Sequence, residues 1–241
     1  MMLGTMTRSL TIALTSFLLW ASPLYATSDN IQPLQPFLAS YELDWDGPVS
    51  ISGDTVRELK KTAQGEWQFQ SKATSMFASI FEETNFKWGE QTLLPIHYTF
   101  KRSVFGKKRS AVIRFDWTNY QVTNDVENKP WQMAITAGVQ DKLSYQLLLQ
   151  QELAKGKQEF SYSVADGGTL KEYKFKVIGE EKIQAPIGTY DAIRVQRVRD
   201  ADNPRQTFIW FAPELDFQII KLKQIEKKNK AYTLLLKKLT K

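Results

Sequence analysis

An alternation of apolar and polar residues with a period of two dominates this chain. Clear examples are the segments 39–45, 67–73, 111–117 and 173–177. In one of them, Ile113, Phe115 and Trp117 alternate with Arg114 and Asp116. This period is typical of β-strands with one buried face. The segments 190–199, 205–211, 217–225 and 231–239 are also strand-like.

Turn-forming residues separate these segments. Reversals are predicted at Asp46-Gly47-Pro48, Asp166-Gly167-Gly168, Asp202-Asn203-Pro204 and 227–230. Glycine, proline and asparagine favour the backbone angles of tight turns. Because the turns are mostly closely spaced, we expect consecutive strands to pair as an antiparallel meander.

One segment departs from this period. From 139 to 153 the apolar residues Val139, Leu143 and Leu147 follow helical spacing. Asp141 is a suitable N-cap and Gly156 lies near the other end. One helix among ten or more strands predicts an all-β fold. So many strand edges are best covered in a strongly curved antiparallel sheet, either a closed β-barrel or an open half-barrel, with the helix against an open end or the concave face.

The amino terminus has the pattern of a secretory signal peptide. Arg8 is its only charge, the apolar run Leu10–Trp20 follows, and Ala26 is a small residue at a suitable cleavage position. This run is shorter than the roughly 20 residues that a transmembrane helix requires. We therefore expect residues 1–26 to be removed, residues 27–36 to form a flexible segment, and residues 37–241 to fold as a single all-β domain without a transmembrane segment.

Composition narrows the possible chemistry. At 42% hydrophobic and 24% charged residues the chain is typical of globular proteins. The sequence has no cysteine, which excludes a lipoprotein anchor, disulfides and thiol catalysis. Its one histidine, His97, excludes a site with two imidazoles. We expect a periplasmic protein that is not a lipoprotein, and no catalytic residue, metal site or cofactor is predicted.

A basic cluster is the candidate binding site. Lys101, Arg102, Lys107, Lys108 and Arg109 surround Phe105. Such a hairpin tip suits anionic envelope lipid, lipopolysaccharide phosphates or acidic glycans. Alternatively, it is a solvated hairpin whose lysines prevent edge pairing. Nucleic acid is not expected as a partner, because no recognition module is present.

Three other groups of residues have side chains that could carry chemistry. His97 falls on the expected outer face and has no evident partner to orient it as a base. Two carboxylates could act in glycoside hydrolysis, but most of the acids fit surface charges, with Asp141 as a helix cap. These acids are Glu82, Glu83, Asp116, Asp125 and Asp141. The tryptophans at 45, 67, 88, 117, 131 and 210 either fill the concave face or line an apolar cavity.

Several motifs point to a family. They are the segments 37–41, 137–146, 177–195 and 208–213. Together they resemble the exported bacterial proteins grouped as domain of unknown function 3108, over about residues 37–239. The resemblance implies export by a Gram-negative bacterium and carries no known activity, cofactor or catalytic residue. The architecture is more distantly similar to the curved sheets of periplasmic lipoprotein carriers.

Three functional hypotheses follow. The first is a non-catalytic periplasmic protein that binds an apolar or amphiphilic envelope component. The second is an interaction module in envelope assembly, which docks on an envelope protein through a sheet edge or the basic hairpin. The third is a glycan hydrolase. A hollow concave face favours the first hypothesis, and a filled one favours the second.

Overall fold

The computed structural model of the protein describes residues 34–46, 51–89, 92–126, 129–226 and 230–241. The predicted signal peptide and most of the predicted flexible segment lie outside these residues. Within them, residues 34–36 precede the first strand and have no regular secondary structure.

The described residues form one antiparallel sheet of fourteen strands, one α-helix and one short 3-10 helix. The strands are β1 (Phe37–Asp46), β2 (Ile51–Lys61), β3 (Trp67–Ser75), β4 (Ala78–Trp88), β5 (Leu93–Val104), β6 (Lys107–Asp116), β7 (Gln121–Val126), β8 (Lys129–Ala134), β9 (Glu159–Asp166), β10 (Thr169–Ala185), β11 (Gly188–Val198), β12 (Gln206–Ala212), β13 (Gln218–Ile225) and β14 (Ala231–Thr240). The helices are α1 (Ser144–Ala154) and η1 (Pro213–Leu215). The prediction of an all-β protein with one α-helix is confirmed.

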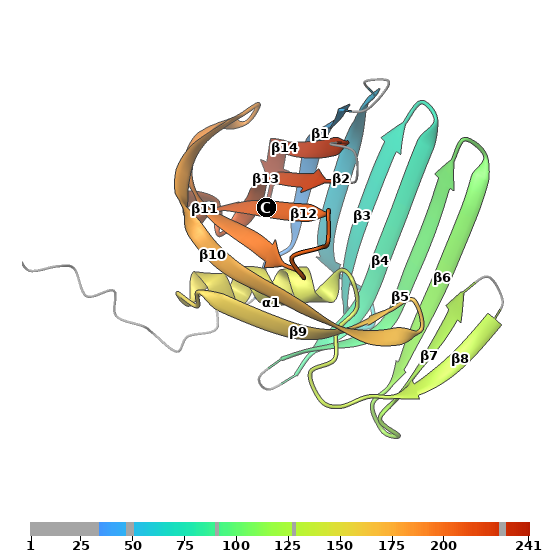
Figure 1. Cartoon of the computed structure of the whole chain (residues 1–241). Helices are drawn as coiled ribbons and strands as arrows, with labels where there is room; N and C mark the ends of the chain where they lie inside the picture. Colours follow the sequence, from blue (N-terminus) through green and yellow to red (C-terminus); the bar gives the residue numbers. More distant parts are fainter. Residues whose placement is uncertain (1–33, 47–50, 90–91, 127–128, 227–229) are drawn as a thin grey trace, which may run out of the picture.

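The sheet is strongly curved and its two edges do not pair with each other. Its order is β8-β7-β6-β5-β4-β3-β2-β1-β14-β13-β12-β11-β10-β9. All paired strands are therefore neighbours in sequence except β1 with β14, and the consecutive strands β8 and β9 are the two edges. Figure 1 shows β9 and β10 curling in front of α1, towards the end of the sheet that holds β7 and β8. Of the two predicted geometries, the structure is therefore the open half-barrel.

The connection from β8 to α1 bridges the seam between the two edge strands. The N–H of Gln140 donates to the carbonyl of Ser163 at 2.8 Å, and the N–H of Ala165 donates to the carbonyl of Gln140 at 2.8 Å. The Gln140 side-chain amide also donates to the carbonyl of Leu93 at 2.9 Å. The ring of Trp131 on β8 packs directly on Gly168 in the β9–β10 turn, where a Cβ would lie 2.0 Å from it. These contacts hold the edges together without a continuous strand ladder.

Strand alternation places the core as predicted. On β9, Phe160, Tyr162 and Val164 are buried while the residues between them are exposed. The β12 strand differs, because every residue from Thr207 to Ala212 is buried. Arg194 explains part of this, since its guanidinium carbon lies 4.5 Å from the Phe208 ring centroid and 5.2 Å from that of Trp210. Its side chain therefore covers aromatic surface that the strand turns outward.

The α1 helix lies on the concave face and is buried along much of its length. It begins at Ser144, five residues later than the predicted start at 139, because Gln140 is in the bridge to β9. Asp141 is not the formal N-cap residue, but its Oδ1 accepts hydrogen bonds from the N–H of Leu143 at 2.7 Å and of Ser144 at 2.9 Å. It therefore satisfies two N–H groups at the start of the helix.

The predicted reversals agree with the strand pairing. Asp166-Gly167-Gly168 joins β9 to β10, and Asp202-Asn203-Pro204 lies between β11 and β12. The other two reversals, at Asp46-Gly47-Pro48 and 227–230, fall largely outside the described residues. The strands that flank them, β1 with β2 and β13 with β14, pair antiparallel.

Candidate ligand-binding pocket

An apolar pocket of about 410 Å³ opens on the concave face beside the start of α1. Its lining comes from seven neighbouring strands, from the start of α1 and from two hairpin turns, β3–β4 and β5–β6. The apolar residues are Leu43, Trp45, Ala73, Phe77, Ala78, Ile80, Val104, Phe105, Leu143, Leu222 and Leu234. The volume is within the range of about 300–1,000 Å³ that is usual for small-ligand sites.

Strand register brings these apolar residues side by side. Leu234 on β14 pairs with Leu43 on β1 and with Leu222 on β13. On the other flank, Ala73 pairs with Ile80. Because paired residues across strands point to the same face, the apolar side chains form a continuous lining.

The pocket is hollow because the inward residues of β3 become small along the strand. Trp67 and Phe69 are buried in the core, whereas Ser71, Ala73 and Ser75 line the pocket. The start of α1 covers part of this face, where Leu143, the residue before the helix, and Gln146 within it line the pocket. Small side chains on the sheet therefore leave a space that the helix does not fill.

One buried cation faces this apolar space. Arg57 on β2 is 7% exposed, and its Nη2 donates to Oε1 of Gln146 at 2.6 Å. Its guanidinium carbon lies 4.9 Å from the Phe69 ring centroid. Burial raises the pKa of the neighbouring Tyr41, and the charge of Arg57 offsets part of that rise. Among the described residues, Arg57 has no carboxylate within ion-pair distance.

The single acid among the lining residues has partners of its own. Glu82 accepts a hydrogen bond of 2.5 Å from the Tyr98 hydroxyl, and Lys142 Nζ lies 4.0 Å from the same carboxylate. Burial and the charge of Glu82 raise the pKa of Tyr98 well above its ordinary value. The Tyr98 hydroxyl therefore stays protonated and remains a donor to Glu82.

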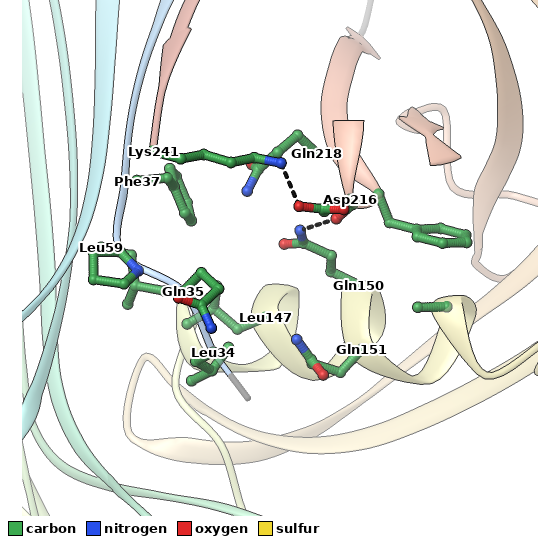
Figure 2. A pocket seen from close by; sticks show the side chains of 13 residues that line it. Leu34, Gln35, Phe37, Leu59, Leu147, Gln150, Gln151, Asp216, Gln218 and Lys241 are labelled. Carbon is green, nitrogen blue, oxygen red and sulfur yellow. Dashed lines mark hydrogen bonds and ion pairs between the residues drawn. The ribbon is translucent and has the colours of Figure 1, made fainter. Parts of the chain in front are cut away.

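The other half of α1 borders a much smaller space. A crevice of about 50 Å³ lies between the start of β1, the helix and the turn at Asp216 (Figure 2). Gln150 Nε2 donates to the carbonyl of Asp216 at 2.9 Å, and Lys241 pairs with the Asp216 carboxylate. A space of this size is enough for one or a few water molecules and too small for an organic ligand.

The six residues of the sequence-predicted binding site lie together on one hairpin. Lys101 and Arg102 lie near the end of β5, and Phe105 is in the turn. Lys107, Lys108 and Arg109 begin β6. Phe105 lines the apolar pocket, while the five cations lie outside it. Lys101, Arg102, Lys108 and Arg109 line a shallow neighbouring depression.

Not all of the candidate acids face the pocket, although Glu82 and Asp141 both lie close enough to Tyr98 to raise its pKa. Of the five acids, Glu82 lines the pocket, while Glu83 bonds to Gln70 and Asp116 is exposed at a turn. Burial, followed by the charge of Arg114, lowers the pKa of His97. No helix in the described ranges has the length and apolar character needed to cross a bilayer.

Sequence reasoning missed Arg57, Gln146 and the aliphatic residues from β1, β13 and β14. Their proximity depends on the pairing of the first strand with the last and on where α1 crosses the sheet. One local signal was available, which is the change from Trp67 and Phe69 to Ser71 and Ala73 along a single alternating strand.

Fold and pocket together define an open antiparallel half-barrel with an apolar concave pocket. The chain belongs to the family described as Protein of unknown function (DUF3108), whose sequence model matches residues 40–237. This match confirms the resemblance seen in the sequence. A comparison with curated proteins finds no match.

One solved structure shows the same kind of fold, and two others match with lower scores. A β-barrel-like protein of domain of unknown function DUF1849 from Brucella abortus has a TM-score of 0.56 at 10% identity, over 85% of this chain and 97% of that one. A putative outer membrane lipoprotein-sorting protein domain from Vibrio parahaemolyticus has a TM-score of 0.24 at 10% identity, over 89% and 87%. A DUF1329 protein from Desulfovibrio piger has a TM-score of 0.26 at 8% identity, over 88% and 87%. The fold assignment rests on the first of these.

Proposed function

We propose that this protein works in the Gram-negative periplasm, where its concave pocket holds the apolar chain of an amphiphilic envelope component. The observation that carries the proposal is the apolar lining of the 410 Å³ pocket. Two sequence features support the location: the signal-peptide pattern around Arg8 and Leu10–Trp20, and the family resemblance.

Arg57 defines the charge of the ligand. A buried guanidinium is costly unless an anion pairs with it, and Gln146 supplies only a neutral acceptor. A carboxylate or phosphate at the inner end of the pocket offsets this cost and accepts charge-assisted hydrogen bonds. The ligand class is therefore an amphiphile with one apolar chain and an anionic group.

Ligand binding can be tested with a fluorescent fatty acid. Protein isolated from the periplasm is titrated with cis-parinaric acid, which is then displaced with palmitate or with hexadecanol. We expect palmitate to compete better than the alcohol of equal length, because only palmitate pairs with Arg57. Native mass spectrometry of the same preparation should show a copurified amphiphile. Absence of both the copurified amphiphile and the displacement contradicts the proposal.

Two variants test the role of Arg57. Replacing it (Arg57→Met) should weaken palmitate binding by about 10- to 100-fold, the loss expected for a hydrogen bond to a charged group, while hexadecanol binding changes little. Arg199→Met is the matched control, because Arg199 is partly buried but lines a different cavity. Equal losses for both variants, or an equal loss for both ligands, contradict a specific role for Arg57.

Filling the pocket tests where the apolar chain of the ligand binds. Ala73→Trp places a large ring into the space, so we expect ligand binding to be lost. Lys72→Trp adds the same ring on the opposite, exposed face of β3 and should leave binding intact. Ligand binding that survives Ala73→Trp would exclude this pocket as the site.

The location has its own test. Protein recovered from the periplasmic fraction should begin at Thr27 by amino-terminal sequencing, one residue after the predicted cleavage position. Uncleaved protein that stays in the cytoplasm contradicts the periplasmic assignment.

A further inference from the structure

Two neighbouring hairpin turns project three large apolar side chains into solvent. Met76 and Phe77 lie between β3 and β4 and are 84% and 50% exposed, and Phe105 lies between β5 and β6 and is 68% exposed. We call these three residues the apolar tip. Isolated exposed apolar residues are common, but a group at the end of adjacent hairpins marks an interaction site.

The apolar tip is an ordered feature of the fold. The rings of Phe77 and Phe105 stack with centroids 5.4 Å apart, and the N–H of Phe105 donates to the carbonyl of Phe77 at 2.9 Å. Phe105 has a φ of 47°, in the left-handed region that favours glycine or asparagine. The turn thus holds a bulky aromatic residue in solvent where a small polar residue fits with less strain.

Five cations flank the apolar tip. Arg102 pairs across the hairpin with Arg109, and Lys108 and Lys107 pair with Ser103 and Val104. With Lys101 these residues form the basic flank, and none of the five makes an ion pair within the described part of the chain. The sequence from 91 to 115 contains no acid. Its positive charge is therefore not neutralised locally.

We propose that the apolar tip and the basic flank form a docking surface for an anionic lipid bilayer. Aromatic and methionine side chains enter the headgroup region, while lysine and arginine pair with lipid phosphates. An acidic protein surface would match the charge but not three protruding apolar side chains. The combination of both features favours the bilayer.

The docking surface adjoins the pocket. Phe77 and Phe105 belong to the apolar tip and also line the pocket. A docked molecule therefore turns the rim of the pocket towards the membrane. This inference goes beyond ligand binding and does not require it, since a protein with an occupied or blocked pocket still carries the same surface.

Vesicle flotation tests the docking surface. Vesicles of phosphatidylethanolamine with phosphatidylglycerol are compared with vesicles of phosphatidylcholine alone. We expect the protein to float with the anionic vesicles, and this binding to weaken as salt is raised. Equal binding to both compositions, or binding to neither, overturns the proposal.

Charge reversal tests which residues attract the protein to the anionic bilayer. The triple variant Lys107→Glu, Lys108→Glu and Arg109→Glu should lower the affinity for anionic vesicles by at least about 100-fold, since each cation near such a surface contributes about fivefold. The control replaces Lys155, Lys176 and Lys238 with glutamate, which changes the total charge by the same amount. These three lysines are exposed and lie outside the basic flank. Equal losses for the two triple variants would show a general charge effect and overturn the assignment.

A second variant separates insertion from attraction. Met76→Ser combined with Phe105→Ser should weaken vesicle binding by about tenfold without changing its dependence on salt, because the basic flank is intact. All of these positions are exposed, so thermal unfolding should be unchanged. Ala73→Trp blocks only the pocket, so it should bind vesicles normally. Unaltered protein that docks on vesicles but binds no amphiphile would contradict the proposed function alone.

Discussion

The two ends of the concave face have the same alternating strands but different contents. At the end covered by β9 and β10, Tyr145 of α1 packs against Tyr162, Tyr173 and Phe175, with ring centroids 5.4–6.0 Å from its own. At the other end, Ala73 and Ile80 face the open pocket. Alternation determines which side chains point inward. Whether they are covered depends on the element that crosses the face.

The largest effect is expected at the filled end. Phe175→Ala removes a buried ring from the cluster around Tyr145 and should lower the free energy of unfolding by about 3–5 kcal/mol. Urea unfolding monitored by tryptophan fluorescence measures this change. A loss below about 1 kcal/mol would show that this end is as loosely packed as the pocket.

The second effect concerns the start of α1. Burial raises the pKa of Asp141 from 3.8 to about 6. Because the folded state holds this proton more tightly than the unfolded chain, stability from this group is full below pH 4 and is lost as the pH rises through 6. The total is about 3 kcal/mol. Urea unfolding between pH 4 and pH 7 should show the free energy of unfolding of the wild type falling as the pH rises, while that of Asp141→Asn lacks this fall. Parallel pH profiles for the two proteins would contradict the prediction.

The third effect is at the seam. Gly168→Ala should destabilise the fold by about 1–2 kcal/mol more than Gly106→Ala, measured by thermal or urea unfolding. Both glycines are the second residue of a hairpin turn with positive φ, but an added Cβ meets Trp131 only at Gly168. Equal losses would show that the packing of Trp131 on the turn contributes nothing to holding the edges together.

The smallest effect is expected in the pocket. Ile80→Ser removes an apolar side chain that is already partly exposed, so stability should change by less than about 0.5 kcal/mol. The same variant should weaken binding of the fluorescent fatty acid. A destabilisation as large as that of Phe175→Ala would mean that the pocket is part of the packed core.

The sequence predicted most of the architecture and little of the pocket. Local alternation and turn residues suffice for strands and their consecutive pairing. The start of α1 was predicted too early, because Val139 fits a helix by spacing while Gln140 is in the bridge to β9. The sequence does not distinguish Arg57 from an exposed arginine, because its burial depends on Gln146, which is 89 positions away. The basic hairpin was found because its residues are adjacent in sequence.

The pairing of β1 with β14 also constrains how the chain folds. Strands β1–β8 and β9–β14 pair with sequence neighbours and can form as two local meanders. Until β1 and β14 pair with each other, each leaves a bare edge in the middle of the future sheet. The two halves then expose their apolar inner faces as separate sheets. These faces are open to aggregation or chaperone binding during folding. That period therefore ends when β14, a single strand of ten residues, pairs with β1.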